Sequence, residues 1–237
     1  MFEVIKKGLE TSLQDYPGRV GFLNQGFPPS GPMDSWSFRL ANLVVGNNAE
    51  EAALECQFMG PTLKFKSDHV ISICGGDMQP KIDGVAIPLW ESILIKTGQT
   101  LELSFSLTGA RTYIAFSGGI KSDLWLGSKS TFHKAAIGGI EGSALKDSQK
   151  VQLGISVGQA GKKIKKEVIP KMSNDGLWEI EVVRGPNDDW LDSNGYEIFL
   201  AAKWKLQARS DRTGFRLDGP LLTFTEKATD KSPEHGY

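Results

Sequence analysis

The chain has 237 residues, of which 40% are hydrophobic and 23% charged, which is enough for one large or two small globular domains with a sizeable core. Its 27 lysines and arginines nearly balance its 28 aspartates and glutamates, which excludes a charge field of one sign that would attract a nucleic acid or an anionic membrane. We therefore expect no nucleic acid and no membrane among its partners.

The two cysteines and the start of the chain indicate the compartment. Cys56 and Cys74 lie in apolar stretches, and the first residues lack the apolar core of a secretory signal. No apolar run approaches the roughly 18 residues that a membrane span needs. We interpret both cysteines as buried thiols of a cytoplasmic protein.

Short strands separated by turns are predicted along most of the chain. Strand-like segments lie at residues 1–7, 61–66, 69–75, 89–96, 100–106 and 110–118, and again at 178–185, 196–202 and 221–226. Gly and Asp clusters divide them, and this density of short strands favours barrels or sandwiches over a parallel sheet with crossover helices. The expected fold class is mainly β.

One helix is predicted, within residues 34–47. The residues expected on its core face share helical spacing: Trp36, Leu40, Leu43 and Val44. The opposite face would carry Ser35, Arg39 and Asn42. Asp34 stands where an N-cap belongs, and Gly46 stands where a C′ glycine belongs.

The segment before this helix, TSLQDYPGRVGFLNQGFPPSGPMD at residues 11–34, contains four glycines and four prolines, too many turn formers for a long strand or helix. It is either an ordered loop at the mouth of a site or a loose connector. Asp15 and Arg19 flank a Tyr-Pro-Gly turn, where they form either a structural ion pair or a substrate contact. Glu55 lies in a mostly apolar stretch, so its carboxylate is either partnered or exposed.

Other chemical motifs are weak. The three histidines are far apart, and none has a metal-ligand spacing with Cys, Asp or Glu, so we expect no metal site. The glycines at 138, 139 and 142 lack both G-x-G-x-x-G and a following GK[ST], so glycine-rich turns are the better interpretation.

A change in composition suggests a domain boundary. Residues 161–176 contain five lysines and a proline in place of the alternating apolar pattern. We predict a first domain at residues 1–160, a lysine-rich linker at 161–176 and a second domain at 177–237.

Several blocks in order resemble the biotin-dependent carboxyltransferase family: TSLQDYPGR, SGPMD, ANLVVGN, MGPTLKF, GARTYIAFSGGI, LGSKST and SDRTGFRLDGP. This family includes the C-type component of 5-oxoprolinase, allophanate hydrolase subunit 2, an antagonist of a sporulation-kinase inhibitor, and the carboxyltransferase region of urea carboxylase. The resemblance implies two tandem cyclophilin-like β-barrel domains with few helices. Family members continue for several tens of residues beyond the stretch matched here, so the second barrel is expected to be incomplete.

The family's characteristic segments imply site residues. We assign catalytic roles to Asp15 and Asp34, which would orient the substrate or remove a proton, and to Arg19 and Arg212, which would stabilise charge on an amide oxygen. The residues expected to bind substrate are Gln14, Ser30, Asn42, Glu55, Ser210 and Arg216.

The resemblance implies an enzyme subunit that opens the lactam ring of 5-oxoproline to glutamate at the expense of ATP. Its partners would be an allophanate hydrolase subunit 1-like protein and a third 5-oxoprolinase subunit, with a small molecule as substrate. Because no phosphate-binding loop is found, ATP would be handled through the partners, this chain would bind no cofactor, and it would be inactive alone.

Two alternatives remain open. In one, the chain transfers a carboxyl group from biotin to urea or a related amide. A separate carrier would then supply the biotin, because the chain lacks a biotinyl-lysine motif. In the other, it is a regulatory protein that binds a sporulation-kinase inhibitor.

Overall fold

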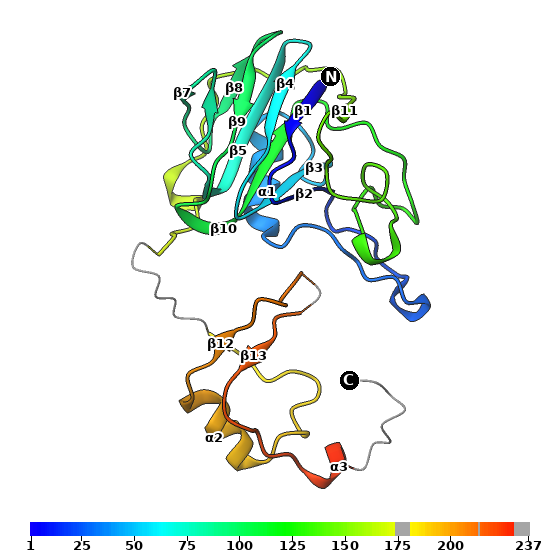
Figure 1. Ribbon diagram of the computed structural model, residues 1–237, viewed down its shortest axis with the longest axis vertical. Helices are drawn as coiled ribbons and strands as arrows, with labels where there is room; N and C mark the ends of the chain where they lie inside the picture. Colours follow the sequence, from blue (N-terminus) through cyan, green and yellow to red (C-terminus); the bar gives the residue numbers. More distant parts are fainter. Residues whose placement is uncertain (174–180, 213, 230–237) are drawn as a thin grey trace. The chain divides into compact units, whose positions relative to one another are not determined.

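Two β-sheets and one helix make up most of the first of two units in the chain. The structure is a computed structural model that describes residues 1–173, 181–212 and 214–229. Contacts within the chain separate Met1–Leu177 from Trp178–Tyr237 (Figure 1). The predicted division into two domains and a linker stays a prediction.

The first unit contains a six-stranded and a five-stranded antiparallel sheet. The first has the order β11-β1-β4-β9-β6-β7, built from β1 (Phe2–Lys6), β4 (Thr62–Phe65), β6 (Lys81–Ile82), β7 (Val85–Ala86), β9 (Thr100–Glu102) and β11 (Lys150–Val151). The second has the order β2-β3-β10-β5-β8, built from β2 (Glu10–Gln14), β3 (Ala53–Gln57), β5 (His69–Asp77), β8 (Ser92–Ile95) and β10 (Thr108–Phe116). The mainly β prediction is confirmed. Both sheets are open in the described residues, so the closed barrels that the resemblance implies are not seen there.

Strand β10 is buried on both faces, which explains its nearly continuous apolar sequence. On one face, Phe116 stacks on Phe2 of the other sheet with ring centroids 5.2 Å apart, and Ile114 lies in the same core. On the other face, Tyr113 and Ala115 pack in a second core beneath the helix. Dispersion and burial on both sides therefore fix this strand in the centre of the unit.

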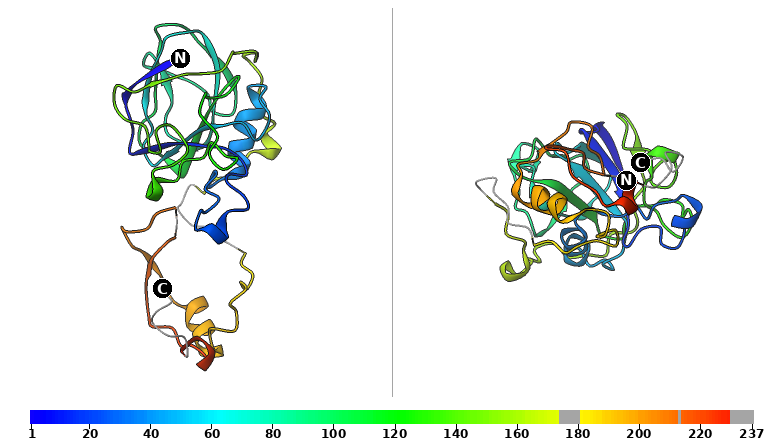
Figure 2. Two further views of the ribbon diagram at one scale, coloured as in Figure 1. Left: turned by 90° about the vertical axis from the view of Figure 1, so that its right-hand side faces the viewer. Right: turned by 90° about the horizontal axis from the view of Figure 1, so that it is seen from below.

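The helix α1 (Ser35–Val44) lies on one side of the first unit (Figure 2), and its predicted ends are confirmed. The Asp34 carboxylate accepts a hydrogen bond from the backbone N–H of Ser37 at 3.0 Å, which makes Asp34 the N-cap. Gly46 has φ of 83° and its N–H donates to the carbonyl of Leu43 at 3.1 Å, as expected for a C′ glycine.

The predicted core face of α1 was wrong in part. Trp36 and Leu43 are 49% and 50% exposed, whereas the buried helix residues are Ser37, Phe38, Ala41, Asn42 and Val44. These residues also recur at helical spacing, and Phe38 supplies the large ring that packs edge-on against Tyr113 at 5.6 Å between centroids. The Trp36 indole instead donates a hydrogen bond to the carbonyl of Val168, in the 3₁₀-helix Lys166–Val168.

The second unit contains α2 (Ser193–Ala201), the strand pair β12 (Lys205–Leu206) and β13 (Leu217–Asp218), and the short helix α3 (Glu226–Thr229). The strand predicted at 196–202 was wrong, because those residues lie in and directly after α2. Asp192 caps that helix by accepting from the N–H of Gly195 at 2.7 Å. A short apolar run fits a strand or a helix equally well, and here the cap decides.

Two further strand predictions in this unit also need correction. Residues 221–226 form no strand, although Phe224 makes an isolated bridge to Leu191. Residues 181–185 form no strand either, and the remainder of that prediction, 178–180, lies outside the described residues.

Both cysteines are buried, as predicted. Burial raises the pKa of the Cys56 thiol to about 12 and also raises that of Cys74. The thiols are therefore neutral members of the two cores of the first unit. None of the described helices is long and apolar enough to cross a membrane.

His69 provides a prediction about pH. Its side chain is buried, its Nε2 lies 2.8 Å from the carbonyl oxygen of Ser117, and burial lowers its pKa below the ordinary value of 6.5. As the pH falls below 6.5, the unfolded chain takes up a proton that the folded chain does not, so the free energy of unfolding should fall until the folded pKa is passed. Denaturant unfolding at about pH 7 and about pH 5 measures this loss, which should be smaller in His69→Gln. Equal losses in the two proteins would contradict it.

Candidate functional site

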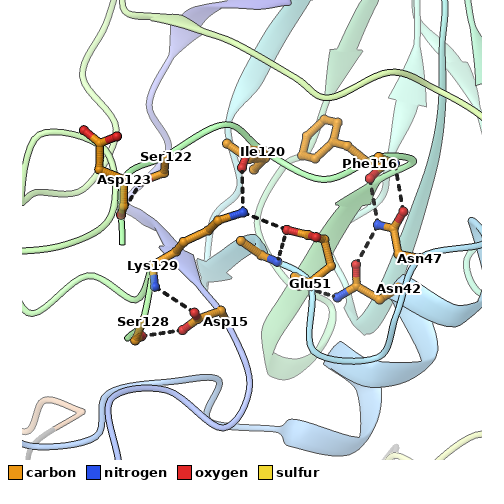
Figure 3. Close-up of polar contacts among 12 residues, drawn as sticks. Asp15, Asn42, Asn47, Glu51, Phe116, Ile120, Ser122, Asp123, Ser128 and Lys129 are labelled. Carbon is orange, nitrogen blue, oxygen red and sulfur yellow. Dashed lines mark hydrogen bonds and ion pairs between the residues drawn. The ribbon is translucent and has the colours of Figure 1, made fainter. Parts of the chain in front are cut away.

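Asp15 follows β2 and fastens a distant loop to the end of that strand (Figure 3). Its carboxylate accepts hydrogen bonds from the Ser128 hydroxyl at 2.6 Å, the Lys129 N–H at 2.7 Å and the Ser130 hydroxyl at 2.5 Å. The Asp15 N–H donates back to the Ser130 hydroxyl at 3.0 Å. One carboxylate therefore organises three consecutive residues that lie more than 110 positions away in the sequence.

Arg19 holds the same loop from another side. Its side chain is buried, its Nε donates to the carbonyl of Trp125 at 3.2 Å, and its Nη2 donates to the carbonyl of Ser130 at 2.9 Å. The guanidinium carbon lies 4.8 Å from the centroid of the Trp125 ring, a cation–π contact. Burial lowers the pKa of Arg19, yet an arginine stays charged.

Asp15 and Arg19 form no ion pair with each other within the part of the chain that the structure describes. Both instead bind residues 125–130. Neither alternative from the sequence, a turn-closing ion pair or free groups facing a substrate, describes this arrangement.

Lys129 and Glu51 form an ion pair next to this clamp, and sequence reasoning missed both residues. The Lys129 ammonium lies 2.9 Å from the Glu51 carboxylate and 3.4 Å from the carbonyl of Ile120 (Figure 3). The two side chains are 24% and 32% exposed. They are 78 positions apart, so no spacing pattern could have joined them. The only sequence signal was that Lys129 belongs to the LGSKST block.

The amide side chains predicted to bind substrate lie inside the fold. Asn42 is fully buried, donates to the carbonyl of Glu51 at 2.8 Å and accepts from Asn47 at 2.9 Å (Figure 3). Gln14 is also fully buried, and its Nε2 donates to the Ser12 hydroxyl at 3.0 Å. Their contact with a substrate stays a prediction.

Glu55 lies under the turn that precedes α1. Its Oε2 accepts from the N–H of Met33 at 2.8 Å and from the hydroxyl of Tyr113 at 2.9 Å, and its Oε1 lies 3.5 Å from Nε of Arg111. The Tyr113 hydroxyl accepts from the N–H of Asp34 at 2.7 Å. The carboxylate is therefore both buried and partnered, the first of the two possibilities that the sequence left open.

Ser30 stands apart from the other predicted residues. It has φ of 57° and the next residue, Gly31, has φ of 79°, so two successive residues take the left-handed conformation. A Cβ on Gly31 would lie 2.9 Å from the carbonyl oxygen of Pro17, and one on Gly18 would lie 2.3 Å from that of Pro29, so both glycines are required. Among the described residues the half-buried Ser30 hydroxyl makes no hydrogen bond. It is available to a ligand.

The remaining predicted residues belong to the second unit. Ser210, Arg212 and Arg216 lie in the connection between β12 and β13. The Ser210 hydroxyl accepts from the backbone N–H of Arg216 at 3.0 Å, and Asp211 forms a bridge with Gly214. Ser210 therefore closes its own turn.

Metal ligands and cavities do not identify a second site. Within the described residues, no group of three His, Cys, Asp or Glu side chains could hold a metal ion. A cavity of about 420 Å³ lies beside β6 and β7, lined by Asp77, Gln79, Pro80, Lys81, Ala86, Ile87 and Leu89. None of the predicted site residues lines it.

Comparisons with known proteins identify the family. Residues 25–237 match the model of the carboxyltransferase domain, subdomain A and B. The chain is 40% identical over 225 residues to urea amidolyase of Saccharomyces cerevisiae, covering 92% of this chain and 12% of that protein. It is 32% identical over 233 residues to a 5-oxoprolinase subunit of Escherichia coli, covering 98% of this chain and 72% of that one.

A solved structure agrees with these relatives. The crystal structure of the urea amidolyase of K. lactis matches with a TM-score of 0.87 and 39% identity, covering 94% of this chain and 14% of that one. The chain thus spans only a small part of the urea amidolyases that it matches, whereas it spans most of the 5-oxoprolinase subunit. The family model, the relatives and the shared fold agree, and the chain belongs to the carboxyltransferase domain family, subdomains A and B.

Proposed function

We propose that this chain is the carboxyltransferase part of an enzyme that acts on the amide group of a small molecule, and that urea is its substrate. The observation that carries the proposal is the 40% identity, over 92% of the chain, to a urea amidolyase. Urea and 5-oxoproline both present an amide nitrogen beside a carbonyl oxygen, so a binding group for either must hydrogen-bond an amide.

The Ser30 hydroxyl suits this chemistry because it donates one hydrogen bond and accepts others. It would accept from the N–H of the amide or donate to its carbonyl oxygen. The carboxylate of Asp15 and the guanidinium of Arg19 hold the loop at 125–130, so their part in binding would be to keep the neighbouring backbone fixed. In a fixed site, binding energy is not spent on ordering the protein.

Biotin would supply carboxyl-group transfer when bound, but the described residues do not fit it. The carboxylates of Asp15 and Glu55 and the guanidinium of Arg19 are already bonded to the protein, which leaves the Ser30 hydroxyl as the free group of that cluster within the described part of the chain. A single hydroxyl does not make a binding site for the fused rings of biotin. We therefore assign no reaction step of this chain to biotin.

A second candidate is an ATP-dependent 5-oxoprolinase subunit that works with partner subunits. The specific observation in its favour is that the chain spans 72% of a relative named as a 5-oxoprolinase subunit, compared with 12% of the urea amidolyase. In that case ATP and part of the site would come from the partners.

The composition of the native enzyme distinguishes the two candidates. We expect the protein, purified through an affinity tag from its native cell, to be present with a biotin-carrying polypeptide, either separate or continuous with this chain. Mass spectrometry and streptavidin blotting of the preparation measure this. Two partner subunits without biotin would favour the 5-oxoprolinase candidate and contradict the urea proposal.

A further inference from the structure

Two consecutive backbone N–H groups in the turn before α1 point into the protein interior. The N–H of Met33 donates to the carboxylate of Glu55 at 2.8 Å, and the N–H of Asp34 donates to the hydroxyl of Tyr113 at 2.7 Å. The Tyr113 hydroxyl in turn donates to the same carboxylate oxygen of Glu55 at 2.9 Å. A single phenol–carboxylate pair therefore fixes both N–H groups.

The pair is built into the five-stranded sheet. Glu55 on β3 and Tyr113 on β10 are direct cross-strand partners, so the register of two central strands sets the position of both side chains. They are 4% and 0% exposed, and a carboxylate buried to this extent is costly unless it is hydrogen-bonded. Burial, and then the charge of Glu55, raise the pKa of Tyr113, so its hydroxyl keeps the proton that it donates.

The other end of the same turn carries the Ser30 hydroxyl, which is free among the described residues. Between the two ends the chain packs tightly, since the N–H of Arg19 donates to the carbonyl of Pro29 at 2.6 Å and no side chain fits at Gly31. A displacement at Met33 and Asp34 would therefore move Ser30. A left-handed conformation at a residue other than glycine costs free energy and needs such support from its surroundings.

We propose that Tyr113 and Glu55 are positioning residues, which hold the turn at residues 30–34 so that the Ser30 hydroxyl contacts the small-molecule substrate, and that Glu55 itself does not touch the substrate. The identity of the substrate rests on the proposed function. The positioning of the turn rests on the hydrogen bonds alone.

The first test is amide hydrogen exchange, which needs no enzyme activity. In the unsubstituted protein the N–H groups of Met33 and Asp34 should already be protected, and Tyr113→Phe should raise the exchange rate of Asp34 at least about tenfold. This change removes the hydroxyl and keeps the ring that packs on Phe38.

A matched control lies on the same strand. Thr112 is fully buried and its hydroxyl donates to the carbonyl of Gly76 at 2.7 Å, away from the turn. Thr112→Val therefore also deletes one buried hydroxyl, and it should leave exchange at Met33 and Asp34 unchanged.

The second test is steady-state kinetics of the assembled native enzyme with urea and with 5-oxoproline. For the substrate that is consumed, Tyr113→Phe should raise KM at least about fivefold and leave kcat within about twofold. A loss of folded protein would lower kcat and leave KM unchanged, so the split between the two constants separates positioning from stability. Ser30→Ala should also raise KM, and the double variant should be no worse than the poorer single variant.

Two results would overturn the proposal: unprotected Met33 and Asp34 amides in the unsubstituted protein, or a KM that Tyr113→Phe leaves unchanged. Additive effects of the Tyr113 and Ser30 substitutions would also overturn it, because they would show that Tyr113 does not act through the turn. If neither urea nor 5-oxoproline is consumed while the exchange results hold, the proposed function fails and the positioning of the turn stands.

Discussion

The Asp15→Ala variant should lose about 4 kcal/mol of unfolding free energy, a large share of the stability of an ordinary domain. The change removes the acceptor for two hydroxyls and one backbone N–H, and the residues that carry the hydroxyls, Ser128 and Ser130, are fully buried. A buried donor left without an acceptor costs roughly 1–3 kcal/mol. Denaturant unfolding of the two proteins measures the difference.

Asp123→Ala is the control for this variant. Asp123 lies near the same loop and is exposed, so its replacement should change the unfolding free energy by less than about 0.5 kcal/mol. A loss below about 1 kcal/mol in Asp15→Ala would show that the loop at 125–130 is held by other contacts.

The Arg19→Met variant should lose about 3 kcal/mol. Methionine fills much of the same volume but cannot donate to the carbonyls of Trp125 and Ser130. Hydrogen bonds from charged donors are worth roughly 1.5–3 kcal/mol each, and removing a buried charge recovers part of that sum. Thermal and denaturant unfolding both report the loss.

Arg39→Met is the matched control because Arg39 is an exposed arginine whose recorded contact is a cation–π contact with Tyr16 at 5.3 Å. Its replacement should cost no more than about 1 kcal/mol. If Arg19→Lys were as stable as the unsubstituted protein, one donor would suffice and the two-carbonyl arrangement would be unimportant.

The local features of the first unit were predictable from sequence because neighbouring residues determine them. Asp34 and Gly46 mark the ends of α1 through their own backbone preferences. The apolar run around Ile114 marks a central strand. In the second unit the same approach failed at residues 196–202, where an apolar run short enough to be a strand is capped as a helix by Asp192.

The contacts of the candidate site could not be predicted, because its partners are distant in sequence. The three donors to Asp15 lie beyond residue 127, and the partner of Glu55 is Tyr113 across a strand pair. Sequence alone marked Asp15, Arg19 and Glu55 as polar groups in unusual places. The structure shows that each is bonded to the protein and that the hydroxyl of Ser30 is free among the described residues.

The most direct test of the account is whether the assembled native enzyme consumes urea in the presence of ATP and bicarbonate. We predict that urea is consumed and that Ser30→Ala raises KM for urea without an equal loss of kcat. Consumption of 5-oxoproline in place of urea would keep an amide substrate and contradict the choice of urea. Consumption of neither would contradict the central claim that this chain serves an enzyme acting on a small-molecule amide.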